Sequence, residues 1–177
     1  MRPEWADAKI REAKLLDATA IAKVQVDSWR STYAGVVPRD YLETLSYEQR
    51  TTAWSTILSA STDGQFVYVA EDHGGTVVGF ASGGQERCGN PIYDGELYAI
   101  YLLESHQWMG LGRLLTSTIA QRLLEEDIHS MLVWVLAGNP SRFFYEALGA
   151  TQVSERSIKI GGTALTEVAY AGPILAL

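Results

Sequence analysis

Glycine residues mark the point where a strand-like run of the chain gives way to a helical pattern. The segment QWMGLG, residues 107–112, follows the apolar run 96–102. Apolar residues then recur at every fourth position, at Leu111, Leu115, Ile119 and Leu123. Glycines allow a backbone to approach a ligand, and the free N–H groups at a helix start favour an anion such as pyrophosphate. These residues therefore indicate a phosphate-binding turn.

The same spacing is compatible with a tight turn that binds nothing. A Walker phosphate loop is excluded, because neither Gly-Lys-Ser nor Gly-Lys-Thr follows the segment. The dinucleotide-binding fingerprint is incomplete, because Leu115 stands where its third glycine belongs. The surrounding elements must therefore decide between a ligand site and a simple helix entry.

Those elements are predicted to alternate between strands and helices. Strands are expected at 9–13, 66–70, 77–80, 96–102 and 131–136, with a C-terminal hairpin of 157–160 and 165–170. Helices are expected after Asp17, after Pro38, from Gly110, and between an Asn139 cap and a left-handed Gly149. The run 131–136 is apolar throughout, as is typical of a strand covered on both faces. It is therefore expected to lie parallel to 96–102, with the intervening helix as the crossover.

The composition predicts one domain over residues 1–177 that is soluble and cytoplasmic. No apolar run is long enough to span a membrane, and none near Met1 has the form of a signal peptide. The single cysteine, Cys88, and three scattered histidines predict neither a disulfide nor a metal site. The net charge of −7 opposes nucleic-acid binding and favours cationic or neutral partners.

Two linked motifs resemble those of the GNAT superfamily of acyl-CoA N-acyltransferases, and the similarity extends over nearly the whole chain. Gln107, Gly110 and Gly112 match the superfamily's signature of Gln or Arg, two residues, Gly, one residue, then Gly or Ala. The segment 134–150 is similar to the family's strand, Asn cap and Phe-Tyr-Glu-x-x-Gly helix. The segment 28–35 resembles one that helps to wall the acceptor pocket in many bacterial members.

The resemblance implies a mixed α/β fold. The expected sheet is twisted, mostly antiparallel and six- or seven-stranded, with helices on both faces and a splayed parallel strand pair that holds CoA. The implied activity is that of an N-acetyltransferase, which moves an acetyl group from acetyl-CoA onto an amine without a metal. We expect direct attack in a ternary complex, because the chain offers no convincing nucleophile for an acyl-enzyme. A non-catalytic CoA-binding sensor or interaction module on the same fold is the alternative, and a homodimer stays open.

The reaction requires an uncharged amine, whereas an aliphatic amine with a pKa of about 10 is mostly protonated at neutral pH. Glu96 matches by position the glutamate that serves as general base in some family members, although a solvated strand-end carboxylate fits equally well. Tyr98 and a water relay are further alternatives for this role. Tyr145 matches the tyrosine that protonates the departing thiolate, with core packing as its alternative.

The same resemblance assigns residues to CoA and to the acceptor. The N–H of Ile100 is expected to hold the thioester oxygen, and Leu102 is expected to pair with the pantetheine arm. The other residues expected to contact CoA are Gln107, Trp108, Met109, Gly110, Leu111, Gly112, Arg113 and Asn139. Trp29 and Tyr33 are assigned to the acceptor pocket, although their helical spacing also fits core packing.

The chain departs from the family pattern at two positions of the turn. Trp108 stands where glycine is usual, and Met109 stands where a basic residue is frequent. Contacts with the pyrophosphate are therefore expected to depend more on backbone amides and on Arg113.

Overall fold

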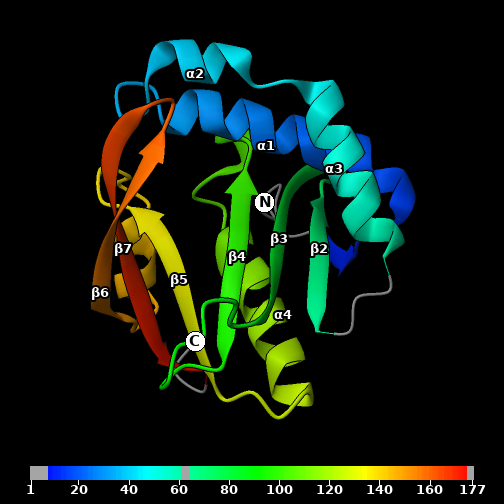
Figure 1. Ribbon diagram of the computed structural model, residues 1–177. Helices are drawn as coiled ribbons and strands as arrows, with labels where there is room; N and C mark the ends of the chain where they lie inside the picture. The colour runs from blue at the N-terminus through cyan, green and yellow to red at the C-terminus, as the bar shows by residue number, and fades with distance from the viewer. Residues whose placement is uncertain (1–7, 61–63, 175–177) are drawn as a thin grey trace.

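The chain forms one seven-stranded sheet in the order β1-β2-β3-β4-β5-β7-β6, as a computed structural model that describes residues 8–60 and 64–174 shows (Figure 1). The strands are β1 (Lys9–Glu12), β2 (Gln65–Glu71), β3 (Val77–Gln85), β4 (Gly95–Leu102), β5 (Ser130–Leu136), β6 (Thr151–Ile160) and β7 (Thr163–Pro173). The helices are α1 (Ala18–Thr32), α2 (Arg39–Thr44), α3 (Tyr47–Ser59), α4 (Leu111–Glu125) and α5 (Arg142–Ala147). Within the described ranges, no helix is both long and apolar enough to cross a membrane.

β4 and β5 form the one parallel pair of neighbours in this sheet order, and all other neighbouring strands are antiparallel. Only three residue pairs join them, from Gly95 with Met131 to Leu97 with Val133. Both strands continue beyond these pairs and diverge toward their C-terminal ends, as Figure 1 shows. This confirms the predicted mixed sheet with a splayed parallel pair. We call the gap between β4 beyond Leu97 and β5 beyond Val133 the splay.

A β-bulge in β4 accounts for the divergence. Ser82 of β3 lies opposite Ala99, whereas the next residue, Gly83, lies opposite Leu97, so Tyr98 is an extra residue on β4. An extra residue bends its strand and sharpens the local twist. Because the bulge follows directly on the last residue that pairs with β5, it turns the rest of β4 away from that strand.

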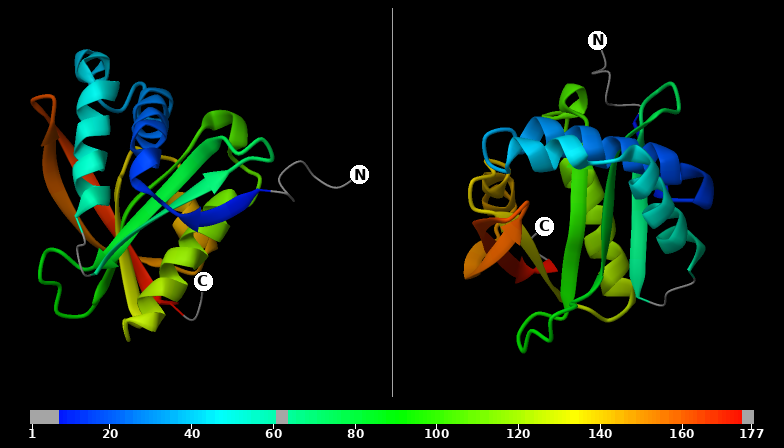
Figure 2. Two further views of the ribbon diagram at one scale, coloured as in Figure 1. Left: turned by 90° about the vertical axis from the view of Figure 1, so that its right-hand side faces the viewer. Right: turned by 45° about the horizontal axis from the view of Figure 1, so that its top comes forward.

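Helices cover both faces of the sheet (Figure 2). The four apolar residues of α4 that recur at every fourth position are at most 1% exposed and pack against one face of β3, β4 and β5. On the other face, Ile21 and Val24 of α1 and Trp54 of α3 bury Phe80 of β3. The predicted helices after Pro38 and from Gly110 are confirmed, as are both predicted hairpins. Helix α3 was not predicted, because Trp54 is its single fully buried residue.

Asp17 lies at the start of α1 but does not cap it, contrary to the prediction. Its carboxylate instead accepts hydrogen bonds from Nη1 and Nη2 of Arg11, at 2.8 and 2.9 Å, and from the N–H of Lys14 at 2.7 Å. Arg11 also donates to Glu71 on β2 at 2.7 Å. This network fastens the beginning of α1 to the edge of the sheet. The hydrogen bonds from Arg11 lower the pKa of Asp17 below its ordinary value of 3.8.

Replacement of Asp17 by asparagine is expected to lower the free energy of unfolding by about 2 kcal/mol at pH 7, because charged hydrogen bonds contribute that much when partly buried. Since folding lowers the pKa of Asp17, its contribution is present above pH 3.8 and is lost as the pH falls through the folded-state pKa. Urea unfolding between pH 2 and pH 7 should show the difference between parent and variant shrinking toward acid. The exposed Glu155, exchanged for glutamine, is the control, and an equal loss in both variants would contradict the assignment.

Candidate active site

The predicted phosphate-binding turn lies at the C-terminal end of β4, beside the splay. Gly110 precedes α4 with a φ of 82°, and no side chain caps the helix. The first helical bond runs from the N–H of Leu114 to the carbonyl of Gly110 at 3.1 Å. The N–H groups of Leu111, Gly112 and Arg113 therefore have no partner within the helix. Because the side chain of Leu111 is buried in the core, only its backbone is available to a ligand.

The backbone of β4 also directs donors into the splay. The N–H of Leu103 donates to Val78 of β3 at 2.9 Å. Backbone groups alternate sides along a strand, so the N–H groups of Ile100 and Leu102 point away from β3 and toward the splay. The carbonyl of Leu102 accepts from the side chains of Ser28 and Gln107, both at 3.2 Å. Gln107 of the sequence motif therefore holds the turn to the end of β4.

Trp108 and Met109 contribute little side-chain surface to the turn. The indole of Trp108 is 99% exposed, and its backbone has a φ of 65°. A left-handed conformation of this kind favours glycine, which explains physically why glycine is usual at this position. The side chain of Met109 packs against the core on the α4 face. The side chain of Arg113 is exposed on the first turn of α4.

Replacement of Trp108 by glycine is expected to raise the free energy of unfolding by about 1 kcal/mol, because it relieves left-handed strain and removes no buried surface. Asp127 is the matched control, since it has a φ of 61° but belongs to a residue type that adopts this conformation more readily. Asp127→Gly should therefore stabilise less. Urea midpoints measure both changes, and a destabilised Trp108→Gly variant would contradict the argument.

Tyr145 lies on α5 with its ring buried between those of Phe144 and Tyr170, at centroid distances of 5.3 and 6.2 Å. The residue is 7% exposed. Burial raises the pKa of Tyr145, and the nearby Tyr101 raises it further, so the phenol is protonated at neutral pH. Among the hydrogen bonds of residues 8–60 and 64–174, none involves its hydroxyl. Tyr145 therefore has a proton and a free donor.

Asn139 joins the loop after β5 to the end of α1. Its Nδ2 donates to the hydroxyl of Tyr33 at 3.3 Å, and its Oδ1 accepts from the N–H of Ser141 at 2.8 Å. The predicted cap is therefore displaced, because the amide closes a turn before α5, which begins at Arg142 rather than at Pro140. The left-handed Gly149 after α5 is confirmed by its φ of 90°. The predicted contact of Asn139 with CoA stays a prediction.

Aromatic rings line the face of the splay that α1 covers. The rings of Trp29 and Tyr33 lie 4.7 Å apart, and Tyr33 is buried beside Leu136 of β5. Tyr101 of β4 packs there as well, and its hydroxyl adjoins Trp29 and Tyr33. Burial raises the pKa of both Tyr33 and Tyr101. Tyr101 was not predicted as a site residue, although its place in the strand before the turn was a signal for it.

Glu96 lies at the closed end of the parallel pair, opposite Leu132 of β5. It is 3% exposed, so the predicted alternative of a solvated strand-end carboxylate is wrong, whereas its role as general base stays a prediction. Its Oε1 accepts from Nη2 of Arg87 at 2.6 Å, and its Oε2 accepts from Nε and the N–H of Arg87, both at 3.2 Å. Four residues of strand, about 13 Å, separate it from Ile100, and six residues, about 20 Å, separate it from Leu102. The structure therefore does not bring Glu96 to the turn.

A second carboxylate, missed in the sequence, lies at the open end. Glu167 of β7 is opposite Leu136 of β5 and pairs with Arg156 of β6, with Nε and Oε2 2.9 Å apart. The guanidinium of Arg156 lies over the indole of Trp134, 3.9 Å from the ring centroid. The contact is cross-strand, between residues eleven positions apart, so no local spacing could indicate it.

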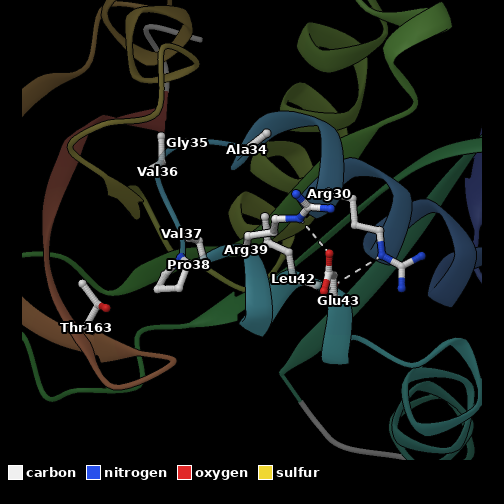
Figure 3. Close-up of a pocket in the computed structure, with 10 residues that line it drawn as sticks. All are labelled: Arg30, Ala34, Gly35, Val36, Val37, Pro38, Arg39, Leu42, Glu43 and Thr163. Carbon is white, nitrogen blue, oxygen red and sulfur yellow. Dashed lines mark hydrogen bonds and ion pairs between the residues drawn. The ribbon is translucent and has the colours of Figure 1, made fainter.

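A cavity of about 700 Å³ lies next to this region, between the segment after α1 and the tip of the β6–β7 hairpin. Figure 3 shows Thr163 on one wall, and Arg39 and Glu43 of α2 on the other. Arg39 pairs with Glu43 at 2.8 Å, and Arg30 donates to the carbonyl of Leu42 at 3.4 Å. Arg30, Ala34 and Gly35 line it, and all three belong to the segment 28–35 that resembles an acceptor-pocket wall. The individually predicted site residues, Trp29 and Tyr33 among them, do not line it.

Comparisons with known proteins give a consistent picture. The family model described as FR47-like protein matches residues 84–158. The uncharacterized N-acetyltransferase YuaI of Bacillus subtilis is 48% identical over 166 residues, which cover 94% of this chain and 93% of that protein. A [ribosomal protein bS18]-alanine N-acetyltransferase of Haemophilus influenzae is 29% identical over 80 residues, covering 45% of this chain and 51% of that protein.

Solved structures share the fold. The PaiA N-acetyltransferase of Thermoplasma acidophilum, in complex with coenzyme A, has a TM-score of 0.72 at 20% identity and covers 90% of this chain and 97% of its own. The yncA protein of Salmonella typhimurium, with its cofactor acetyl-CoA, has a TM-score of 0.69 at 22% identity and covers 94% of each chain.

Proposed function

Because the chain belongs to the GNAT superfamily of N-acetyltransferases, we propose that it transfers an acetyl group from acetyl-CoA to an amine by direct attack in a ternary complex. The splay carries this proposal. It brings free helix N–H groups and strand N–H groups to one gap in the sheet, and the unbonded phenol of Tyr145 is near enough to Tyr101 of β4 for the two to interact electrostatically. The residues present fit acetyl-CoA, and the yncA structure with acetyl-CoA has the same fold.

The pyrophosphate is assigned to the amides at the start of α4, where the helix dipole and three unpartnered donors favour an anion. The exposed guanidinium of Arg113 adds a positive charge at the same place. The pantetheine arm is assigned to the N–H of Leu102, and the thioester oxygen to the N–H of Ile100, where it would stabilise the developing oxyanion. These are backbone roles, so the side chains at 100 and 102 serve packing.

Tyr145 is assigned the role of general acid. When the amine has attacked the thioester carbon, the C–S bond breaks and the thiolate of CoA takes a proton from the hydroxyl of Tyr145. A raised pKa keeps that hydroxyl protonated throughout the neutral range. Cys88 is an unsuitable nucleophile for a covalent intermediate, since it is exposed in the loop between β3 and β4. Direct transfer is therefore favoured.

Removal of the amine's proton was assigned to Glu96 from the sequence. That role stays a prediction, and it requires the acceptor to reach the closed end of the parallel pair and to compete with Arg87 for the carboxylate. A non-catalytic CoA sensor is the second candidate function, favoured by the burial of Glu96.

A panel of amines incubated with acetyl-CoA, scored by thiol release and product mass, tests the proposal. Polyamines, aminoglycosides, amino acids, peptide N-termini and protein lysines belong on the panel. The proposed function predicts release of one CoA for each acetylated amine. In the same assay, the Tyr145→Phe variant should release far less CoA than the parent. Saturable acetyl-CoA binding without turnover on any amine would favour the sensor instead.

A further inference from the structure

Glu167 faces the same side of the splay as the aromatic rings of the site. Residues directly opposite one another in antiparallel strands point to the same face. Glu167 lies opposite both Leu136 of β5 and Arg156 of β6, and Leu136 packs with Tyr33 and next to Tyr101. Along β5, Leu136 is four residues beyond Leu132, which lies opposite Glu96. Glu167 is therefore about 13 Å nearer than Glu96 to the open end.

The two carboxylates also differ in whether an oxygen is free to accept a further hydrogen bond. Glu96 accepts three hydrogen bonds from Arg87 through both of its oxygens. Glu167 accepts one bond, from Arg156 through Oε2, and within the described part of the chain its Oε1 has no partner. Its side chain is 18% exposed, against 4% for Glu96. Glu167 therefore combines a partly desolvated charge with a free oxygen.

The described groups around Glu167 contact one of its carboxylate oxygens and leave the other open. Arg156 faces it from β6 and is held over Trp134, and Cys88 contacts the same guanidinium at 3.8 Å. The charge of Glu167 raises the pKa of Tyr101 on β4, and the charge of Arg50 on α3 lowers it. In the described ranges, the indole N–H groups of Trp29 and Trp134 are buried without a partner.

We propose that Glu167 binds the ammonium group of the acceptor and accepts its proton. The proposal rests on the proposed acetyl transfer. One proton passes from the ammonium to the carboxylate, the neutral nitrogen attacks the thioester carbon, the C–N bond forms and the C–S bond breaks. The CoA thiolate takes the proton of Tyr145, and the amide nitrogen releases its second excess proton to water. The proton held by Glu167 then passes through water to the Tyr145 phenolate, which restores both side chains. The sum is one amide, one CoA thiol and one proton from one ammonium and one acetyl-CoA.

The surroundings of Glu167 also define the acceptor class. Ile158 and Leu165 lie on the same face of the hairpin and are partly buried against the aromatic cluster. Trp134, Tyr101 and these two residues offer apolar surface, whereas Glu167 is a carboxylate that shares this face with Leu136 and Arg156 and has one free oxygen. A primary ammonium on an apolar body matches such a surface better than a polyamine, which would need several carboxylates.

Binding of n-hexylammonium, followed by protein NMR at pH 7 without acetyl-CoA, tests the proposal independently of turnover. The parent should bind it, and Glu167→Gln should weaken binding at least tenfold, with 1-hexanol binding both proteins equally. Glu167→Asp keeps the charge and should recover most of the loss. The control variant is Glu155→Gln, which should bind like the parent. Glu155 is an exposed carboxylate of β6 that lies opposite Val168.

A rate-versus-pH profile on hexylamine completes the test. Glu167→Gln should turn over about 10²-fold more slowly at pH 7, and the deficit should shrink toward pH 10, where the amine has lost its proton in solution. Unchanged hexylammonium binding in Glu167→Gln, absence of binding by the parent, or a larger loss in Glu96→Gln would each overturn the proposal. Failure of the proposed function would appear differently, as binding without CoA release on any amine.

Discussion

Replacement of Tyr145 by phenylalanine is expected to lower the turnover rate by roughly 10²–10⁴-fold, the range typical of general acid–base groups, while acetyl-CoA affinity changes little. The substitution removes only a hydroxyl that has no protein partner among the described residues, and the ring still packs against Phe144 and Tyr170. The substitution is therefore expected to slow the departure of the CoA thiolate. Because burial raises the pKa of Tyr145, its ionisation should cause no loss of rate in the parent below pH 10.

Tyr170→Phe is the matched control, since it removes a hydroxyl from the neighbouring stacked ring. That hydroxyl donates to Glu146 at 2.7 Å, outside the splay. Turnover by this variant should stay within a few-fold of the parent. Single-turnover rates of acetyl transfer should be compared, so that product release does not mask the chemical step. Equal rates for Tyr145→Phe and the parent would return Tyr145 to a packing role.

Replacement of Gly110 by glutamate is expected to weaken acetyl-CoA binding at least 10²-fold, because it places a carboxylate at the amides assigned to the pyrophosphate, and like charges in contact cost several kcal/mol. A Cβ added at Gly110 would meet no atom within 4 Å, so the side chain fits sterically. The φ of 82° adds strain of about 1 kcal/mol, which a folded protein can tolerate.

Gly110→Gln carries the same strain and almost the same volume without the charge. Isothermal calorimetry of both variants with acetyl-CoA therefore separates electrostatics from shape. We expect the glutamine variant to bind much more tightly than the glutamate variant, and the difference to shrink as salt is raised. Equal affinities would move the pyrophosphate away from this turn.

Much of the fold could be predicted because its elements obey local patterns. The apolar repeat of α4 and the alternation in β2 and β3 are properties of neighbouring residues, and the structure has both elements where they were expected. The parallel pair followed from the uniformly apolar run that became β5. Helix α3 was not predicted because a single buried tryptophan gives no helical periodicity of apolar residues.

The geometry of the site depends on features that local patterns do not contain. The bulge at Tyr98 is a matter of register between β3 and β4, and it decides where the splay opens. The burial of Glu96 depends on Arg87, which the chain brings back from the loop after β3. Glu167 and Arg156 meet only because β6 and β7 pair in one register. A motif could locate the turn, but it could not show which carboxylate lies at the open end.

The central claim is that acetyl-CoA lies between the diverging ends of β4 and β5. A crystal structure of the protein with coenzyme A tests this most directly. The account predicts that the pyrophosphate lies on the N–H groups of Leu111, Gly112 and Arg113, and that the sulfur lies within hydrogen-bond reach of the Tyr145 hydroxyl, at about 3–4 Å. Coenzyme A bound outside the splay, or with its sulfur remote from Tyr145, would contradict it.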